Sequence, residues 1–269
     1  MQLPELTLCC VDTRDPALAL WAIARCTAQI GFAEALLFTR AASVTSPPAG
    51  VRVIDVQVET IEAYSEFMLH GLADHVRTSH ALIVQWDGFV RDASRWDPAF
   101  LSYDYIGAPW RDAAIGREVG NGGFSLRSRR LLLALRDPDV RLTHPEDEAI
   151  CLVNRELLEH RHGIRIAPVE VARRFAYERI APPAPTFGFH GLFNFAHELA
   201  PDELAAVVTA LPAHLTRGLD AHDLCALLIR SGRLDLAASL LDKRRQLGMR
   251  DRRTWRLAWR LWRSGLTRR

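Results

Sequence analysis

The chain has 269 residues, of which 49% are hydrophobic and 25% charged, and its formal net charge is +2. This composition is that of an ordinary globular protein, with room for one large domain or for one domain and a smaller appendage. No apolar run approaches the roughly 18 residues that a membrane-spanning helix needs, and no basic leader precedes the first strand, so we expect neither a transmembrane segment nor a signal peptide. Five cysteines without C-x-x-C spacing predict buried thiols in a reducing, cytoplasmic compartment.

The charge is unevenly distributed along the chain. From Arg217 to the end there are 14 basic and 5 acidic residues, a net +9, which leaves 20 basic and 27 acidic residues, a net −7, for the rest. Such a split predicts two functional parts.

Apolar runs alternate with helical periodicity through the first half of the chain. The predicted strands and helices are strand 6–11, helix 16–30, strand 35–38, strand 51–56 and helix 61–76. This βαβ alternation predicts a mostly parallel, doubly wound sheet with helices on both faces. No G-x-G-x-x-G and no Walker A lysine follow the first strand, which disfavours dinucleotide-binding dehydrogenases and P-loop NTPases.

Polar residues follow the apolar runs where strands end. A strand over 81–90 contains Gln85, Trp86 and Asp87 and meets a break at Gly88. A carboxylate at the carboxyl end of such a strand lies where open α/β sheets bind ligands. The alternative is that Asp87 only caps the Asp-Gly turn.

The first strand ends in Val11, Asp12 and Thr13. A nucleotide could bind backbone groups there, and the alternative is that Asp12 and Thr13 merely begin a loop.

Aromatic and glycine-rich stretches occupy the middle of the chain. Tyr105 and Trp110 fall in a stretch, YDYIGAPW, whose rings either stack on sugars or bases or fill the core. Asn121, Gly122 and Gly123 follow, where the backbone can approach a ligand closely or take positive φ. A strand over 124–126 and a helix capped near Ser128 come next, and a glycine-rich turn alone is a weak signal.

Three acids, Glu146, Asp147 and Glu148, open a predicted helix that Gly163 ends, and a strand over 164–168 follows. Acids in a first turn are also favoured by the helix dipole alone. His190 stands in FGFHG, where neither a helix nor a strand needs a histidine. It is either a ligand-binding or a structural residue.

Taken in order, these motifs resemble a GT-A-type glycosyltransferase, in the layout of the β-1,3-galactosyltransferase and fringe group. They are also similar to a related bacterial and fungal family with WDGF, YDYIGAPW and GNGGFSLR stretches. The resemblance covers residues 5–195 and rests on four stretches: QWDGFV at 85–90, GGFSL at 122–126, Glu146-Asp147 before Ile150-Cys151-Leu152, and the late His190.

The resemblance implies a nucleotide-sugar donor and a divalent metal, Mn²⁺ or Mg²⁺, held by Asp87 and His190. Gln85 departs from the D-x-D pattern of the family, which places the metal in doubt. In a metal-independent alternative, arginines such as Arg127 neutralise the leaving diphosphate.

Further roles follow from the same resemblance. Asp147 is implied as the general base, with Glu146 or Glu148 positioning the donor or the acceptor. The implied donor-binding residues are Val11, Asp12, Thr13, Gln85, Trp86, Asp87, Asn121, Gly122, Gly123 and Arg127, and the implied acceptor residues are Trp110 and Tyr105.

From Asp202 on, the sequence pattern is helical, with an αα-hairpin broken at Ser231-Gly232. The final segment interleaves Trp255, Trp259 and Trp262 with arginines. It predicts either an anchor at an anionic membrane or a packed terminal helix with a solvated basic edge, and no nucleic-acid motif accompanies the charge.

We therefore predict a GT-A-like domain over 1–195 and a helical region over 196–269. The main functional hypothesis is a cytoplasmic glycosyltransferase acting on a hydroxyl acceptor in a surface-glycan precursor, peripheral at the inner face of the membrane. The alternative is a non-catalytic GT-A-fold binding module that recruits partners through its helical tail. A nucleotidyltransferase is disfavoured because no basic, glycine-rich loop follows the first strand.

Overall fold

The structure is a computed structural model that describes residues 1–266. It divides into two compact units, Met1–His190 and Gly191–Arg269. The domain boundary that the sequence predicts after residue 195 stays a prediction.

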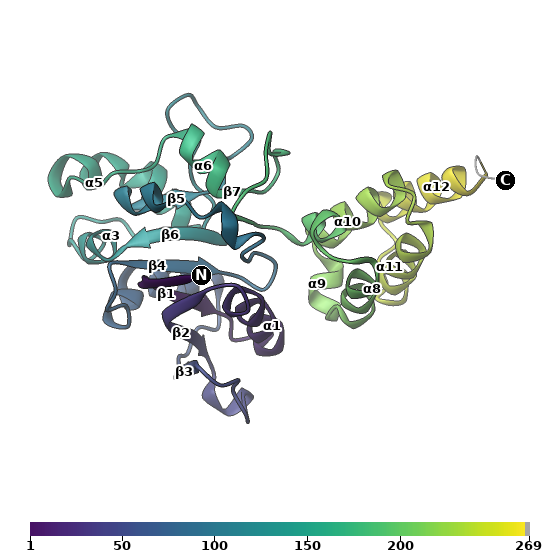
Figure 1. Ribbon diagram of the computed structural model, residues 1–269. Coiled ribbons are helices and arrows are strands. Elements are labelled where there is room, and N and C mark those ends of the chain that lie inside the picture. The colour runs from purple at the N-terminus through teal and green to yellow at the C-terminus, as the bar shows by residue number, and fades with distance from the viewer. Residues whose placement is uncertain (267–269) are drawn as a thin grey trace. The chain divides into compact units, whose positions relative to one another are not determined.

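The first unit is built on a mixed sheet (Figure 1). Its strands are β1 (Gln2–Val11), β2 (Gly31–Thr39), β3 (Val51–Asp55), β4 (His80–Val84), β5 (Tyr105–Gly107) and β6 (Phe124–Ser128). Within the described residues this sheet has six strands in the order β3-β2-β1-β4-β6-β5. Neighbours among β1, β2, β3 and β4 pair in parallel, whereas β6 runs antiparallel to both β4 and β5. A further pair, β7 (Ala176–Tyr177) and β8 (Gly188–Phe189), is parallel.

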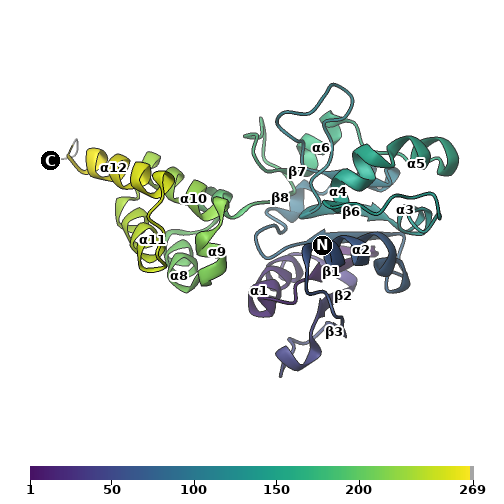
Figure 2. The ribbon, with the colours of Figure 1, turned by 180° about the vertical axis from the view of Figure 1, so that it is seen from behind.

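Helices and helical turns connect the strands of this unit (Figures 1 and 2). They are α1 (Pro16–Thr27), η1 (Ala41–Ser43), α2 (Ile61–Glu66), η2 (Phe67–Gly71), η3 (Leu72–Asp74), η4 (Ala93–Arg95), η5 (Pro98–Ser102), α3 (Arg129–Ala134), α4 (Glu146–Glu148), η6 (Ala149–Val153), α5 (Arg155–His162) and α6 (Val169–Phe175). Since α1 packs on β1 and β2 while η2 and η3 adjoin α3 and a core cluster drawn from β1, β2 and β4, both faces of the sheet are covered. The predicted fold class, a mostly parallel α/β sheet with a helical C-terminal part, is confirmed.

The alternation of buried side chains explains this layering. On β1, Cys9 and Val11 belong to the core cluster with Met68 and Leu72 of the π-helical η2 and the 3-10 turn η3. Their neighbour Cys10 is equally buried but points to the opposite face, because successive strand residues alternate. The strand β4 and the second halves of β1 and β2 are buried on both faces, which is why they appear in the sequence as apolar runs.

Several predicted elements have different bounds. The strand predicted over 81–90 ends at Val84, because Gln85 and Gly88 exchange backbone hydrogen bonds in a turn. The strand predicted over 164–168 is only an isolated bridge between Ile166 and Tyr105.

Two predicted helices are interrupted by π-helical segments. The helix predicted over 61–76 is α2 followed by η2 and η3, and the helix predicted from 146 to 162 is α4, η6 and, after Asn154, α5. Apolar side chains recur at helical spacing through such changes, so periodicity alone does not reveal them. Gly163 ends α5 in the left-handed conformation with φ 63°, as predicted.

The YDYIGAPW stretch is anchored by a buried acid. The Asp104 carboxylate accepts hydrogen bonds from Ser128 Oγ at 2.5 Å and from the Arg165 backbone N–H at 2.8 Å, and it also pairs with Arg130. These bonds outweigh the burial that opposes ionisation, so the pKa of Asp104 is lowered. Asp104 is therefore a structural residue that fixes the start of β5.

The second unit is helical. It contains η7 (Leu192–Asn194), α7 (Phe195–Glu198), α8 (Pro201–Ala210), α9 (Ala213–Arg217), α10 (Leu219–Arg230), α11 (Leu234–Gln246) and α12 (Arg252–Leu266). The predicted hairpin break at Ser231-Gly232 separates α10 from α11, with Gly232 at φ 76°. Arg244 is buried and donates to the carbonyls of Thr216 at 2.6 Å and Gly218 at 3.1 Å, which caps the end of α9. No helix within residues 1–266 is both long and apolar enough to cross a membrane.

Candidate active site

The order of the strands marks one place where a ligand can bind at the edge of the sheet. The chain moves outward from β1 to β2 and β3, then returns to place β4 on the other side of β1. Adjacent parallel strands whose connections leave in opposite directions open a crevice at their carboxyl ends. The candidate site should therefore lie between the ends of β1 and β4.

A cavity of about 340 Å³ occupies this crevice. Pockets that bind small molecules and cofactors start at about this size. The cavity is lined by Val11, Asp12, Thr13, Arg14, Val58, Glu59, Thr60, Ile61, Tyr64, Gln85, Trp86, His144 and Glu146. The structure thus brings together six of the residues that the sequence singled out, from three separate stretches of the chain.

Asp12 and Thr13 also build the loop that forms the cavity wall. Asp12 Oδ1 accepts the backbone N–H groups of Arg14 at 2.9 Å and Asp15 at 2.8 Å, and Thr13 Oγ1 donates to the Val58 carbonyl. Burial raises the pKa of Asp12, although these backbone N–H groups pull it down. Asp15 stands at the N-cap position of α1, and its side chain makes no capping bond there.

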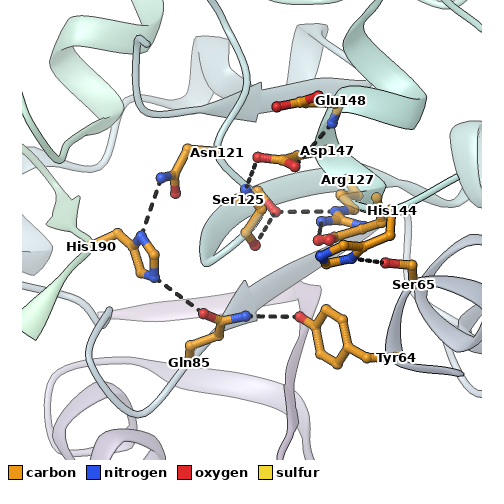
Figure 3. A network of polar contacts seen from close by, with 12 residues as sticks. Tyr64, Ser65, Gln85, Asn121, Ser125, Arg127, His144, Asp147, Glu148 and His190 are labelled. Carbon is orange, nitrogen blue, oxygen red and sulfur yellow. Dashed lines mark hydrogen bonds and ion pairs between the residues drawn. The ribbon is translucent and has the colours of Figure 1, made fainter. Parts of the chain in front are cut away.

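Gln85 connects the cavity to His190 (Figure 3). Its Nε2 donates to the Tyr64 hydroxyl at 3.0 Å, and its Oε1 lies 3.1 Å from His190 Nε2. The amide thus joins the Tyr64 hydroxyl to the His190 ring.

His190 lies among acceptors on both sides of its ring. Nε2 is 3.4 Å from Asp87 Oδ1, and Nδ1 is 3.5 Å from Glu178 Oε1. Burial alone would lower the pKa of His190, but the charges of Asp87 and Glu178 outweigh burial and hold this pKa well above its ordinary value. Nε2 thus faces the Asp87 carboxylate and the Gln85 amide oxygen, and Nδ1 faces the Glu178 carboxylate.

Asn121 contributes to the same cluster. It takes the left-handed conformation, φ 62°, and places Nδ2 at 3.1 Å from His190 Nδ1, while its Oδ1 is buried without a hydrogen-bond partner among the described residues. Rotating the amide by 180° would let Oδ1 accept the proton on Nδ1 and would satisfy both groups. The positive φ that the sequence predicted for this turn belongs to Asn121.

The metal ion that the sequence predicts at Asp87 and His190 stays a prediction. Among the described residues, no group of three or more His, Cys, Asp and Glu side chains could hold a metal ion. Asp87 Oδ1 lies 3.4 Å from His190 Nε2, so these two residues would hold the ion together with groups from outside the chain. We assign no chemical step to a metal.

The metal prediction can be tested by binding. If Asp87 and His190 hold a divalent ion, a chelator should weaken the affinity for a nucleoside diphosphate, Mn²⁺ should restore it, and Asp87→Asn should abolish the effect of Mn²⁺; isothermal titration with and without chelator measures this. An affinity that the chelator changes by less than about twofold would contradict a metal at these residues.

The glycine-rich turn is shaped by protein side chains. A Cβ on Gly123 would lie 2.1 Å from His190 Nε2, and one on Gly122 would lie 2.1 Å from Glu146 Oε1. A Cβ on Gly88 would lie 2.9 Å from His190 Cδ2. The sequence interpretation allowed a ligand to approach this backbone, whereas here the side chains of Glu146 and His190 occupy that space.

Glu146 is held by a buried arginine. Arg127 Nη2 donates to Glu146 Oε1 at 2.9 Å, with side-chain exposures of 0% and 6%, and Arg127 Nε donates to Ser125 Oγ at 3.1 Å. Glu146 also lines the cavity, so Arg127 fixes the orientation of a cavity carboxylate. The interpretation of Arg127 as a group that contacts the diphosphate needs correction, because its guanidinium is fully buried.

Asp147 and Glu148 point elsewhere (Figure 3). Asp147 Oδ2 accepts the Gly122 backbone N–H at 3.1 Å, and Oδ1 accepts the Glu148 N–H at 2.9 Å. Burial, and then the charge of Glu146, raise the pKa of Asp147. Glu148 is exposed. The three acids therefore have three different environments, which a uniform helix-dipole role does not explain.

The two aromatic candidates behave differently. Tyr105 is fully buried, with the Arg127 guanidinium 5.5 Å from its ring centre, so its ring offers no face to a sugar, which corrects its place among the acceptor residues. Trp110 is partly exposed and packs against Gly120, where a Cβ would lie 1.9 Å from its ring. Trp110 therefore contacts the same turn whose Gly122 N–H binds Asp147.

Sequence reasoning missed several residues of the site. Arg14 and His144 line the cavity, and Ser65 Oγ lies 2.8 Å from His144 Nδ1, which leaves Nε2 of the ring for a ligand. Glu178 pairs with His190. Arg14 directly follows Asp12-Thr13 and could have been found from that position, whereas nothing in the sequence around Glu178 points to His190.

The family comparison concerns this part of the chain. Residues 50–190 match the family described as "Protein of unknown function (DUF5672)". The chain belongs to this family. The match spans β3 to β8, and so includes Asp87, the glycine-rich turn, the three acids and His190. A comparison with curated proteins finds no match.

Solved structures with a similar chain path include several glycosyltransferases. One is the galactosyltransferase LgtC in complex with donor and acceptor sugar analogues, with 14% identity, a TM-score of 0.43, and coverage of 68% of this chain and 86% of that chain. Another is the mannosyltransferase PcManGT from Pyrobaculum calidifontis in complex with GDP-Man and Mn²⁺, with 11% identity, a TM-score of 0.42, and coverage of 98% and 73%. A glycosyltransferase involved in the glycosylation of the major capsid of PBCV-1 has 13% identity, a TM-score of 0.41, and coverage of 69% of this chain and 91% of that chain. We base the functional proposal on this chain's own residues, because these TM-scores lie below 0.5.

Proposed function

We propose that the chain is a glycosyltransferase that moves a sugar from a nucleotide-sugar donor to an acceptor hydroxyl. The observation that carries the proposal is the cavity between β1 and β4, which has the Glu146 carboxylate on its wall. A second carboxylate, Asp147, is the next residue of α4 and accepts the Gly122 N–H of the glycine-rich turn. Glycosyl transfer needs a seat for the leaving diphosphate and, in an inverting reaction, a carboxylate base for the acceptor.

The donor occupies the cavity in this proposal. Apolar parts of Val11, Ile61, Tyr64 and Trp86 suit the base and ribose, while Arg14 supplies positive charge to the diphosphate. In the tautomer in which the Ser65 hydroxyl donates to Nδ1 of His144, Nε2 carries the proton and donates to the diphosphate. Arg127 holds Glu146 in position and does not itself contact the donor.

The acceptor hydroxyl meets Asp147, which removes its proton as the sugar is transferred. A raised pKa suits this role, because a base is most effective when its pKa approaches the working pH. Trp110 packs on the same turn and offers a partly exposed ring for stacking on an acceptor sugar. Glu148, which is exposed, has no step in this mechanism.

The cellular setting is a proposal of the same kind. The five cysteines are all free and buried, which suits a reducing compartment and hence a cytoplasmic donor. An acceptor in a surface-glycan precursor fits an enzyme that works on the cytoplasmic side of a membrane. Peripheral attachment to that membrane is a separate proposal, because it rests on the second unit.

Binding of a nucleoside diphosphate tests the donor site. We expect one of a panel of nucleoside diphosphates to raise the melting temperature, and Arg14→Ala and His144→Ala each to weaken its affinity about tenfold or more, since a charged hydrogen bond contributes about 1.5–3 kcal/mol. Arg95→Ala is the matched control, because Arg95 is an exposed arginine of the same unit outside the cavity.

The outcomes separate the hypotheses. If no nucleotide binds, or if Arg95→Ala weakens binding as much as Arg14→Ala, the cavity is not a donor site. The non-catalytic module remains the competing hypothesis, and it predicts nucleotide-sugar binding without release of the nucleoside diphosphate.

A further inference from the structure

The helix α12 presents an exposed stripe of tryptophans. Trp255, Trp259 and Trp262 are 62%, 55% and 63% exposed. At 3.6 residues per turn, positions i, i+4 and i+7 fall on one side of a helix. On the opposite side, Thr254 and Leu257 are buried as α12 packs on α10 and α11 (Figure 2). The stripe is therefore a second apolar face, and it does not contribute to the core of the helical unit.

Arginines lie beside this stripe. Arg252, Arg256 and Arg263 are exposed and follow the helical positions next to the tryptophans, and residues 252–266 contain no acid. The rings are held in place: Trp255 Nε1 donates to the Arg250 carbonyl at 3.1 Å, and the Arg263 guanidinium lies 4.7 Å from the Trp259 ring centre. Exposed apolar rings of this size and density mark an interaction surface.

Two hollows border the stripe, and both combine indole with guanidinium groups. One, of about 440 Å³, lies between α10 and α12 and includes Arg230, Arg260, Arg263 and Trp259. The other, of about 280 Å³, lies at the start of α12 and includes Arg245, Arg250 and Trp255. Neither hollow has an acidic side chain in its lining. Arginine forks bind phosphate oxygens in pairs of hydrogen bonds.

We propose that this face of α12 docks the helical unit on an anionic phospholipid bilayer. The three tryptophans enter the interface between headgroups and acyl chains, and the arginines of the two hollows bind headgroup phosphates. The charge selects this occupant: residues 252–266 carry arginines and no acid, and an interfacial membrane helix combines apolar rings with a basic edge that anionic headgroups attract. The proposal does not depend on glycosyl transfer.

Vesicle sedimentation with the full chain tests the proposal. We expect the protein to bind vesicles that contain phosphatidylglycerol and to bind pure phosphatidylcholine vesicles at least about tenfold more weakly. The triple variant Trp255→Ser, Trp259→Ser, Trp262→Ser should lose about tenfold or more of the binding to anionic vesicles, whereas Leu219→Ser, at a residue 57% exposed in the same unit, should retain it.

Charge is tested by a matched pair of triple variants. Arg250→Gln, Arg260→Gln, Arg263→Gln, which removes exposed arginines of the two hollows, should weaken binding about 10²-fold at low salt, because each basic residue near the surface contributes about fivefold. Arg52→Gln, Arg95→Gln, Arg111→Gln removes the same charge from exposed sites of the first unit and should change binding by less than about twofold. Melting curves check that all variants fold, and quenching of wild-type fluorescence by brominated lipid provides a readout that needs no variant.

Four results would overturn the proposal. Equal binding to neutral and anionic vesicles would show that the arginines do not recognise anionic headgroups. Equal losses of binding in the two arginine variants would show that only the net charge of the chain matters. Vesicle binding by the tryptophan variant at wild-type strength would exclude the stripe. Lipid-free self-association that this variant abolishes would assign the face to a second copy of the chain.

Discussion

Asp147→Asn should lower the rate of sugar transfer by about 10²–10⁴-fold while the melting temperature and the nucleotide affinity stay close to those of the wild type. The loss follows from the proposed role, because an amide cannot accept the proton of the acceptor hydroxyl. Transfer assays with the nucleotide sugar that binds best, combined with melting curves, measure both effects.

The stability part of this prediction has a definite sign. Burial raises the pKa of Asp147 in the folded state, so its contribution to stability is present at low pH and is lost as the pH rises through the folded-state pKa. At neutral pH the carboxylate therefore adds no net stability. Asparagine has one oxygen instead of two, so it can accept only one of the N–H groups of Gly122 and Glu148. The substitution also removes a desolvated charge, so we expect the free energy of unfolding to change by no more than about 1 kcal/mol.

The same shift affects the pH dependence of activity. Because Asp147 must be ionised to act as a base, kcat/KM should fall on the acid side at a pH above the ordinary pKa of an aspartate. Glu148→Gln is the control, since its side chain is exposed, and it should leave both the rate and the pH profile unchanged. If Asp147→Asn is active and Glu146→Gln or Glu148→Gln is inactive at full folding, the base has been assigned to the wrong acid.

Glu146→Gln should destabilise the fold by about 3–5 kcal/mol, the largest stability effect that we expect at the site. The substitution leaves the Arg127 guanidinium buried without its counter-charge, and Arg127 Nη1 already has no hydrogen-bond partner among the described residues. Denaturant unfolding measures the loss, with Glu148→Gln, expected within about 0.5 kcal/mol, as the matched acid.

A double-mutant cycle distinguishes a coupled pair from two separate effects. Arg127→Met alone should also be costly, because it strands Glu146, but the double variant Arg127→Met, Glu146→Leu should recover most of the loss, since an apolar pair can replace a buried ion pair. If the two single costs simply add in an isosteric double variant, Glu146 and Arg127 do not act as a pair.

The framework of the fold could be predicted because its signals are local. Buried parallel strands show as apolar runs, as in β1 and β4, and Ser128 caps α3 by accepting the Leu131 N–H at 3.0 Å, as its position suggested. The antiparallel direction of β6 could not be predicted, because nothing in the residues of a single strand specifies its partner. That direction decides where Arg127 points.

The chemistry of the site was harder to predict, because it depends on contacts between distant residues. An arginine after a glycine-rich turn suggested a phosphate contact, but pairing of β6 with β5 places Arg127 opposite Tyr105 and inside the core. Gln85 suggested a lost metal ligand, but it joins Tyr64 to His190, which is 105 residues away in the sequence. From the sequence positions of these residues we could predict which region of the sheet they lie in, but not which side chains they contact.

The central claim is that the cavity between β1 and β4 binds a nucleotide sugar that the chain then cleaves during transfer. The most direct measurement is release of nucleoside diphosphate from a panel of nucleotide sugars, with wild-type protein and Asp147→Asn side by side. The account predicts that the wild type releases nucleoside diphosphate from at least one donor. The folded variant should still bind that donor but release the diphosphate at least about 10²-fold more slowly. Binding of a nucleotide sugar by the wild type with no release beyond that of Asp147→Asn, even with an acceptor mixture present, would contradict it.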